Sequence, residues 1–200
     1  MRKLANSIST IEKLNRAFLS ALREKEYCDV TITELSERAE INRTTFYLFY
    51  GSKDELFRDL CSALVDQWFQ RFFDLNITRW NHIENVEAEK ELFRQLLGWI
   101  RQWASALKRV FHVRTDTFDG FTLLTAGIEQ KMKAQSVFRT DDEMKRMRYA
   151  LFIKIYSVGL ISILKWWLEE GEDFEENAVH TMIERLRFKG YYSILDNEQD

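Results

Sequence analysis

A run of hydroxyl-bearing and basic side chains is the part of this sequence best suited to chemistry with a partner. If Phe46 points into a hydrophobic core, the helical period turns four neighbours outwards: Arg43, Thr44, Tyr47 and Leu48. Hydroxyls and a guanidinium along an exposed helix can hydrogen-bond phosphate oxygens, and a guanidinium can also bind a base edge. Packing alone explains poorly why threonines should face solvent beside a phenylalanine and a tyrosine. This short helix is therefore a candidate surface for nucleic acid.

Three helix starts lie around this candidate surface. Thr31 with Glu34, and Ser52 with Glu55, have the form of a capping box, in which a hydroxyl residue is followed three positions later by a glutamate. Asn42 is a good N-cap between them. This spacing predicts two short helices, arranged as a helix-turn-helix, and a longer helix after them.

Residues 31–53 resemble the DNA-binding domain of the tetracycline-repressor (TetR) family, whose motif reads roughly T-[VI]-x-x-[IL]-A-x-x-A-G-[VI]-x-x-x-T-[FL]-Y-x-[HY]-F-x-[SN]-K. The matching residues are Thr31, Ile32, Leu35, Ala39, Ile41, Thr45, Phe46, Tyr47, Ser52 and Lys53. Tyr50 and Ser36 replace the usual Phe and Ala. Glu40 replaces a glycine that often needs a left-handed backbone, and Phe49 replaces a His or Tyr that often touches phosphate.

The resemblance implies a homodimer that binds double-stranded DNA at a palindromic operator. The expected DNA-binding residues are Thr31, Thr33, Arg43, Thr44, Thr45, Tyr47, Leu48 and Lys53. Arg43 is expected to contact a base edge, and Thr44 and Leu48 to contact the groove. Thr33, Thr45, Tyr47 and Lys53 are expected to contact phosphates.

Composition predicts an all-α fold. The 200 residues include seven glycines and no proline, and 46% of them are hydrophobic and 30% charged, which suits long helices joined by short turns. The net charge of −3 neither requires nor excludes nucleic acid, because residues 1–60 carry ten basic and ten acidic side chains. We expect a helix-turn-helix DNA-binding domain over residues 1–53 and a larger helical domain for effector binding and dimerisation over residues 54–200.

Apolar spacing predicts the remaining helices. They are expected over about 8–25, 53–75, 88–111, 115–134 and 149–164, with a last helix from about residue 174. The helix at 149–164 is apolar on almost every side but too short, with an internal lysine, to span a bilayer. We therefore expect no membrane association and place the homodimer contact on this helix. Two cysteines far apart in sequence favour the cytoplasm.

Aromatic residues are abundant, and most of them are expected to fill the helical core. The resemblance implies an effector cavity lined by Trp68, Trp99, Trp103, His112, Phe118, Phe121, Tyr149, Phe152 and Tyr156. No motif of an enzyme, cofactor site or metal site occurs, so we expect no enzymatic activity, no cofactor and no metal.

These features favour a transcription regulator, more specifically a repressor released by a small apolar or aromatic effector. The alternative is an interaction protein that uses the TetR-type body to bind a protein partner, with DNA only as an anchor. A closed aromatic cavity would favour the effector, and a filled core with an exposed apolar groove would favour the partner.

Overall fold

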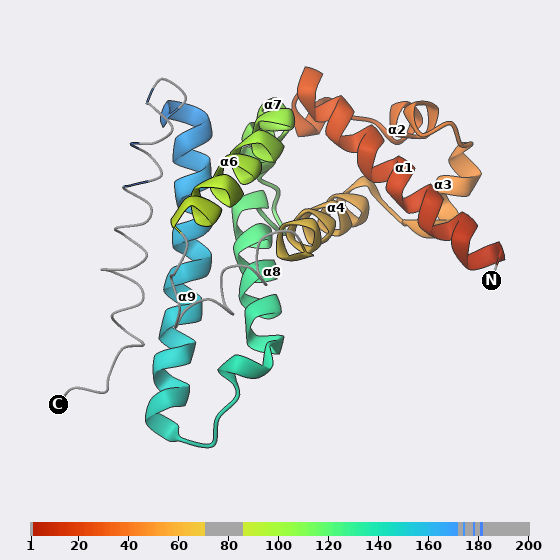
Figure 1. Cartoon of the computed structure of the whole chain (residues 1–200). Coiled ribbons are helices and arrows are strands. Elements are labelled where there is room, and N and C mark those ends of the chain that lie inside the picture. The colour runs from red at the N-terminus through yellow and green to blue at the C-terminus, as the bar shows by residue number, and fades with distance from the viewer. Residues whose placement is uncertain (1, 71–85, 172–173, 175–177, 179–180, 182–200) are drawn as a thin grey trace. The chain divides into compact units, whose positions relative to one another are not determined.

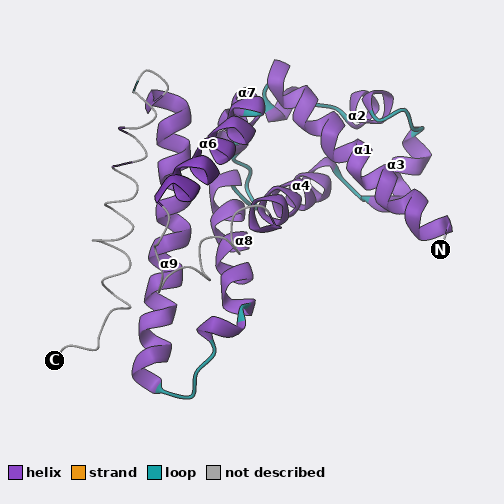
Figure 2. Ribbon diagram, viewed as in Figure 1, coloured by secondary structure: helices purple, strands orange, loops and turns teal. Residues whose placement is uncertain are grey.

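The computed structural model of the chain describes residues 2–70, 86–171, 174, 178 and 181. Every regular element in these ranges is helical (Figure 1; Figure 2). The only backbone bridge found in them joins Arg114 to Asp119 across a turn. The expected all-α fold is confirmed.

In chain order the α-helices are α1 (Arg2–Glu24), α2 (Ile32–Arg38), α3 (Arg43–Phe49), α4 (Lys53–Trp68), α6 (Val86–Gln102), α7 (Ala104–His112), α8 (Gly120–Ala134) and α9 (Glu143–Trp166). The helix-turn-helix consists of α2 and α3, with α1 before it and α4 after it. Shorter 3-10 turns occur at Tyr27–Asp29 and Ser136–Phe138, and a π turn at Trp167–Gly171 follows α9. The expected last helix, and the end of the helix expected over 53–75, fall largely outside the described residues.

The stretch 88–111 was expected to be one helix, and that expectation is wrong. Trp103 separates α6 from α7, with φ −117° and ψ 10°. Its N–H donates to the Ile100 carbonyl at 3.0 Å in a tight closing turn, and the Arg23 guanidinium donates to the Gln102 carbonyl at 2.7 Å. A side chain from α1 thus binds at the break, and the local apolar period does not reveal this contact.

The helix expected over 115–134 starts later, at Gly120. Thr115 Oγ1 accepts the N–H groups two and three residues further on, at 3.3 and 3.1 Å, and this side-chain turn replaces the first helical turn. Asp119 then caps α8, because its Oδ1 accepts the Thr122 N–H at 2.8 Å. That hydrogen bond holds the pKa of Asp119 below its ordinary value.

The chain divides into two compact units, which we describe separately. One comprises Met1–Gln67 and Trp99–Leu123, and the other comprises Trp68–Gly98 and Leu124–Asp200. The domain boundary expected after residue 53 falls at the start of α4, within the first unit. The expected boundary separates a DNA-binding part from an effector-binding part, which the division into compact units does not test, so the boundary stays a prediction.

A cluster of four aromatic rings lies in the first unit. Phe18 in α1 and Phe57 in α4 are buried, and Tyr27 in the turn after α1 and Phe118 before α8 are half-buried. The Tyr27 ring centroid lies 6.0 Å from that of Phe18, 5.1 Å from that of Phe57 and 6.3 Å from that of Phe118. Such pairs contribute about 0.5 to 1.5 kcal/mol each beyond simple burial. The cluster therefore holds the helices that flank the helix-turn-helix.

Two arginine side chains, Arg109 of α7 and Arg23 of α1, hold the C-terminal end of α1 next to the start of α7. Arg109 donates to the carbonyls of Leu22 and Arg23 at 2.8 and 2.9 Å, and its Nε lies 3.0 Å from the Glu26 carboxylate. In return, the Arg23 guanidinium lies 4.5 Å above the Trp103 ring. The last carbonyls of a helix have no partner within the helix, so Arg109 supplies donors where α1 ends.

In the second unit, α9 has a buried side and an exposed apolar side. Phe152 is fully buried, with its ring 6.0 Å from that of Phe138 and 5.5 Å from that of Tyr156. The exposed large apolar side chains of α9 are Met144, Met147, Leu151, Val158 and Trp166.

The length and apolar character of α9 also raise the question of a membrane span. With the π turn after it, the segment Glu143–Gly171 is long enough to cross a bilayer and contains an 18-residue window with a mean hydropathy of 1.5. The core helix of a soluble protein can meet the same criterion, so one such helix is weak evidence for a span.

The backbone at Glu40, after α2, is left-handed. Its φ is 56°, the only positive value found for a non-glycine residue in the described ranges. The sequence comparison with the TetR motif predicted this conformation, and the prediction is confirmed. The Glu40 carboxylate lies 3.6 Å from the Lys13 ammonium, but both groups are largely exposed, so the ion pair contributes little.

We expect Glu40→Gly to raise the free energy of unfolding by about 1 kcal/mol, because glycine adopts a positive φ without steric cost. Chemical denaturation would measure the change. Glu37→Gly is the matched control: Glu37 is exposed inside α2, so its replacement should lower stability by about 1 kcal/mol. A loss of more than about 1 kcal/mol at Glu40 would contradict the argument.

Candidate nucleic-acid interface

The helix α3 is fixed at its N-terminal end by Asn42. The Asn42 Oδ1 accepts the Thr45 N–H at 2.7 Å and the Thr45 hydroxyl at 2.9 Å. On the inner side, Phe46 is fully buried and its ring lies 6.0 Å from that of Tyr50. The cap and the buried ring together set the rotation of α3 about its axis.

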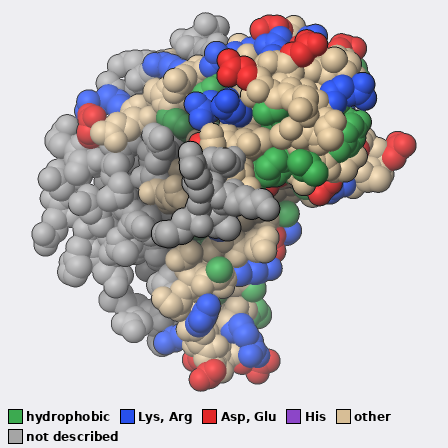
Figure 3. All heavy atoms as spheres, turned by 90° about the vertical axis from the view of Figure 1, so that its right-hand side faces the viewer, with side chains coloured by type: hydrophobic (Ala, Val, Ile, Leu, Met, Phe, Trp, Pro, Cys, Tyr) green, Lys and Arg blue, Asp and Glu red, His purple; other side chains and the backbone are tan. Residues whose placement is uncertain are grey.

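That rotation exposes the side chains expected to meet DNA. Arg43, Thr44, Tyr47 and Leu48 are all exposed, and we call these four residues the recognition face. Leu48 is 77% exposed and Tyr47 is 49% exposed. Figure 3 views the side on which α1 and α3 lie in Figure 1, and it shows hydrophobic side chains exposed among basic and acidic ones.

The helix α2 supports α3 from within the motif. Thr31 Oγ1 accepts the Glu34 N–H at 3.2 Å at the start of α2, and Leu35 is fully buried on its inner side. The Ser36 carbonyl accepts the Ile41 N–H at 3.0 Å, which closes the turn. Thr33 is exposed on the outer side of α2, as expected for a residue that contacts phosphate.

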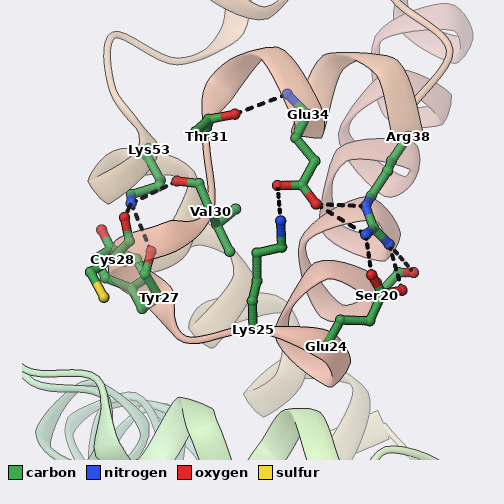
Figure 4. Close-up of polar contacts among 10 residues, drawn as sticks. All are labelled: Ser20, Glu24, Lys25, Tyr27, Cys28, Val30, Thr31, Glu34, Arg38 and Lys53. Carbon is green, nitrogen blue, oxygen red and sulfur yellow. Dashed lines mark hydrogen bonds and ion pairs between the residues drawn. The ribbon is translucent and has the colours of Figure 1, made fainter.

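Lys53, expected at a phosphate, instead points into the protein (Figure 4). Its Nζ donates to the carbonyls of Tyr27 and Val30 at 2.7 and 2.8 Å, and lies 3.4 Å from that of Cys28. It also lies 4.3 Å above the Tyr27 ring. Desolvation lowers the pKa of the ammonium group. These contacts indicate that Lys53 positions the start of α4 against the turn that leads into α2.

We expect Lys53→Met to lower the free energy of unfolding by about 2 kcal/mol, because the carbonyls lose a charged donor. If the ammonium only positions helices, the salt dependence of DNA binding should not change. Arg43→Met is the control, since Arg43 is exposed and should affect stability little. If Lys53→Met left the stability unchanged and reduced the salt dependence of DNA binding by about one unit, Lys53 would be a direct phosphate contact instead.

Arg38 joins α2 to α1 through two side chains of α1, those of Ser20 and Glu24, and also pairs with Glu34 in its own helix (Figure 4). Its guanidinium pairs with Glu34 and Glu24 and donates to Ser20 Oγ at 2.9 Å. Glu34 also pairs with the Lys25 ammonium at 3.1 Å. The hydrogen bond from Arg38 lowers the pKa of Glu24. Burial alone would raise the pKa of Glu34, but the bonds from Lys25 and Arg38 outweigh it and lower that pKa.

Removing Arg38 should destabilise the helix-turn-helix and weaken its pH dependence. Arg38→Met is expected to cost about 1 to 2 kcal/mol at pH 7. Both carboxyl groups have a lowered pKa in the folded state, so their stabilisation is present above the ordinary value of 4.5 and is lost as pH falls through the folded values. The variant should therefore lose less stability below that pH than the parent. An equal loss in both would contradict this account.

The residues expected around an effector cavity are divided between the two units. The first contains Trp99, Trp103, His112, Phe118 and Phe121, and the second contains Trp68, Tyr149, Phe152 and Tyr156. Phe118 and Phe152 belong to the packing described above, and the Arg58 guanidinium lies 4.3 Å above the Phe118 ring. A cavity shared by all nine stays a prediction. In the described part of the chain, no group of three or more His, Cys, Asp or Glu residues could hold a metal ion.

The sequence analysis did not identify two residues, Tyr27 and Arg38, that position the helices of the helix-turn-helix. Tyr27 holds Lys53 with its ring and carbonyl, and its hydroxyl donates to Asp54. Arg38 binds side chains of α1. The only local signal for either was the four-residue spacing of Glu34 and Arg38, which suits an ion pair along a helix.

Residues 19–60 match the family described as bacterial regulatory proteins, tetR family. This segment extends from α1 through α2 and α3 into α4, and so contains the whole helix-turn-helix. The helix-turn-helix segment of this chain therefore has the sequence of a TetR-family DNA-binding domain.

Two curated relatives are similar over part of their length. YxbF of Bacillus subtilis strain 168, an uncharacterized HTH-type transcriptional regulator, is 36% identical over 64 residues, which cover 30% of this chain and 17% of that protein. Rv0767c of Mycobacterium tuberculosis strain H37Rv, described in the same words, is 34% identical over 59 residues, which cover 30% of this chain and 28% of that protein. The match thus spans less than a third of either relative.

Solved structures extend the similarity of fold to nearly the whole chain. A TetR transcriptional regulator from Rhodococcus sp. RHA1 is 13% identical, with a TM-score of 0.55, over 97% of this chain and 100% of that one. The dihydroxyacetone kinase operon activator DhaS is 14% identical, with a TM-score of 0.54, over 90% of this chain and 95% of that one. At these identities the likeness concerns the fold alone.

Proposed function

We propose that this chain is a transcription regulator that binds double-stranded DNA with α3 in the major groove. The observation that carries the proposal is the recognition face, which is exposed while Phe46 on the same helix is fully buried. A helix of seven residues is about 10 Å long, and the major groove of B-DNA is about 12 Å wide. The side chains of α3 therefore suit the reading of base edges there.

Each residue of the interface has a proposed role. The Arg43 guanidinium binds a guanine edge, for which it has the matching donors. The hydroxyls of Thr31, Thr33 and Tyr47 bind phosphates. Thr31 Oγ1 already accepts the Glu34 N–H, but a hydroxyl that accepts can still donate its own hydrogen. Thr45 donates to the Asn42 cap, so a phosphate would compete with that bond.

We further propose that the functional molecule is a homodimer, with α9 in the contact. The exposed apolar side chains of α9 support this, because a soluble monomer rarely leaves so long an apolar stripe uncovered. A two-fold dimer would place two copies of α3 about one helical turn of DNA apart, which requires a palindromic operator.

The mode of regulation rests on the family resemblance. We propose a cytoplasmic repressor in which residues 54–200 bind a small apolar or aromatic effector and change the spacing of the two α3 helices. The rival proposal is a protein partner on the same body. An effector must bind one spacing of the α3 helices more tightly than the other, because a ligand with equal affinity for both shifts nothing. Operator DNA should then weaken the binding of an effector by the same factor.

Selection of bound duplexes from a random library would test DNA binding and symmetry together. We expect a palindromic consensus with two half-sites, and sedimentation of the free protein should give a dimer at micromolar concentration. Recovery of random sequences would contradict specific DNA binding. A non-palindromic consensus, or a stable monomer, would contradict the dimer.

A further inference from the structure

The recognition face changes its chemistry along α3. Its N-terminal half presents the guanidinium of Arg43 and the hydroxyl of Thr44, whereas its C-terminal half presents the ring of Tyr47 and the isobutyl group of Leu48. Leu48, at 77%, is the most exposed of the large apolar side chains that the structure describes. It has neither a donor nor an acceptor, so it cannot hydrogen-bond a base edge or a phosphate.

We propose that Leu48 selects a thymine in each operator half-site by contact with the 5-methyl group. The inference rests on the proposed binding of α3 in the major groove. The thymine methyl is the apolar feature that base pairs present in that groove, and the other edges offer hydrogen-bond donors and acceptors. A leucine over such a polar edge would remove water from it without replacing the lost hydrogen bond. Leu48 therefore favours thymine and opposes the other bases.

Thr44 extends this apolar row. It precedes Leu48 by four residues, so the two side chains are neighbours on one line of the helix surface, with Cβ atoms about 5 to 6 Å apart. Its γ-methyl group can cover the thymine methyl from the N-terminal side. Thr44→Ser, which removes that methyl and keeps the hydroxyl, should therefore weaken the preference for thymine without abolishing it.

The length of α3 gives the spacing between the two bases that are read. Arg43 and Leu48 are five residues apart, which is about 7.5 Å along a helix axis. Base pairs rise about 3.4 Å, so this separation corresponds to about two base-pair steps. We infer a half-site in which a guanine and a thymine lie about two steps apart, with Arg43 at the guanine and Leu48 at the thymine methyl.

The neighbours of Leu48 favour DNA over an apolar protein surface as its partner. The α3 sequence RTTFYLF contains no acidic residue, and Arg43 and Thr44 share the exposed face with Leu48. A guanidinium beside a leucine suits a groove that presents acceptors and methyl groups between two rows of phosphates. An apolar protein groove would leave the guanidinium without an acceptor.

The test uses the full chain and the duplex that it selects from a random library. Thymine at the inferred position is replaced by deoxyuridine in both half-sites, which removes only the two 5-methyl groups. Each buried methyl is expected to account for about fourfold in affinity, equivalent to ~0.8 kcal/mol, so the double replacement should weaken binding by about 15-fold. Leu48→Ala, a change at an exposed position, should bind the thymine and deoxyuridine duplexes within about twofold of each other.

A rescue and a control complete the design. A 5-methylcytosine–guanine pair at that position should bind more tightly than an unmethylated one, and in Leu48→Ala this gain should be no more than about twofold. Deoxyuridine outside the half-sites should change nothing. The role of Leu48 would be overturned, and DNA binding left intact, by either of two results. One is a specific consensus without the thymine, and the other is a wild-type affinity that deoxyuridine does not change. Failure to select any specific duplex would overturn the proposed function itself.

Discussion

Gly120→Ala is expected to lower the free energy of unfolding by about 3 kcal/mol, because the first residue of α8 has no room for a side chain. A Cβ atom at this position would lie 1.8 Å from the Val110 carbonyl oxygen, which is backbone and cannot rotate away. The Gly120 N–H also donates to the Val113 carbonyl at 2.9 Å, so relief of the clash would strain that bond. Chemical denaturation, monitored by tryptophan fluorescence, would measure the loss.

Gly98→Ala is the matched control for this prediction. Gly98 lies within α6, and a Cβ built on it would meet nothing within 4 Å. Alanine favours helix more than glycine does, so this variant should gain up to about 1 kcal/mol. If both variants lost similar amounts, the close approach between Gly120 and Val110 would not be the cause.

Arg43→Ala is expected to have the largest effect on recognition, a loss of about 1 to 3 kcal/mol on the selected duplex, or about 5- to 150-fold in affinity. The loss on random DNA should be small, because phosphate contacts dominate binding there. Competition binding at fixed salt would measure both. The control is Arg94→Ala, which removes the same charge from an exposed i,i+3 pair with Glu91 in the second unit.

A chemical change in the DNA would identify the atom that Arg43 contacts. Replacing the inferred guanine by 7-deazaguanine removes the N7 acceptor, so it should weaken the parent and barely affect Arg43→Ala. If Arg43→Ala reduced the affinity for specific and random duplexes equally, Arg43 would bind a phosphate rather than a base edge.

The helix-turn-helix could be predicted because its determinants are local. Thr31 and Asn42 cap helices within three residues of themselves, and the expected starts of α2 and α3 agree with the structure. The left-handed Glu40 follows from the same local pattern. The outward direction of the recognition face then depends only on one buried ring, that of Phe46.

The features that the sequence did not reveal depend on contacts between residues that are distant in sequence. The break at Trp103 uses a bond from Arg23 to Gln102, 79 positions away. Lys53 binds the Tyr27 carbonyl, 26 positions away, and so does not extend into solvent as a lysine at a helix start usually can. No periodicity within either segment carries this information. The motif that residues 31–53 share with the TetR family also does not distinguish a lysine that contacts phosphate from one that positions a helix.

The central claim is that α3 distinguishes one DNA sequence from others. The most direct test compares the affinity of the full chain for its selected duplex and for a scrambled duplex of the same composition, at physiological salt. We predict a ratio of at least about 10³, which should fall sharply in the Arg43→Ala, Leu48→Ala double variant while its stability remains close to that of the parent. Equal affinities for the two duplexes would contradict the account.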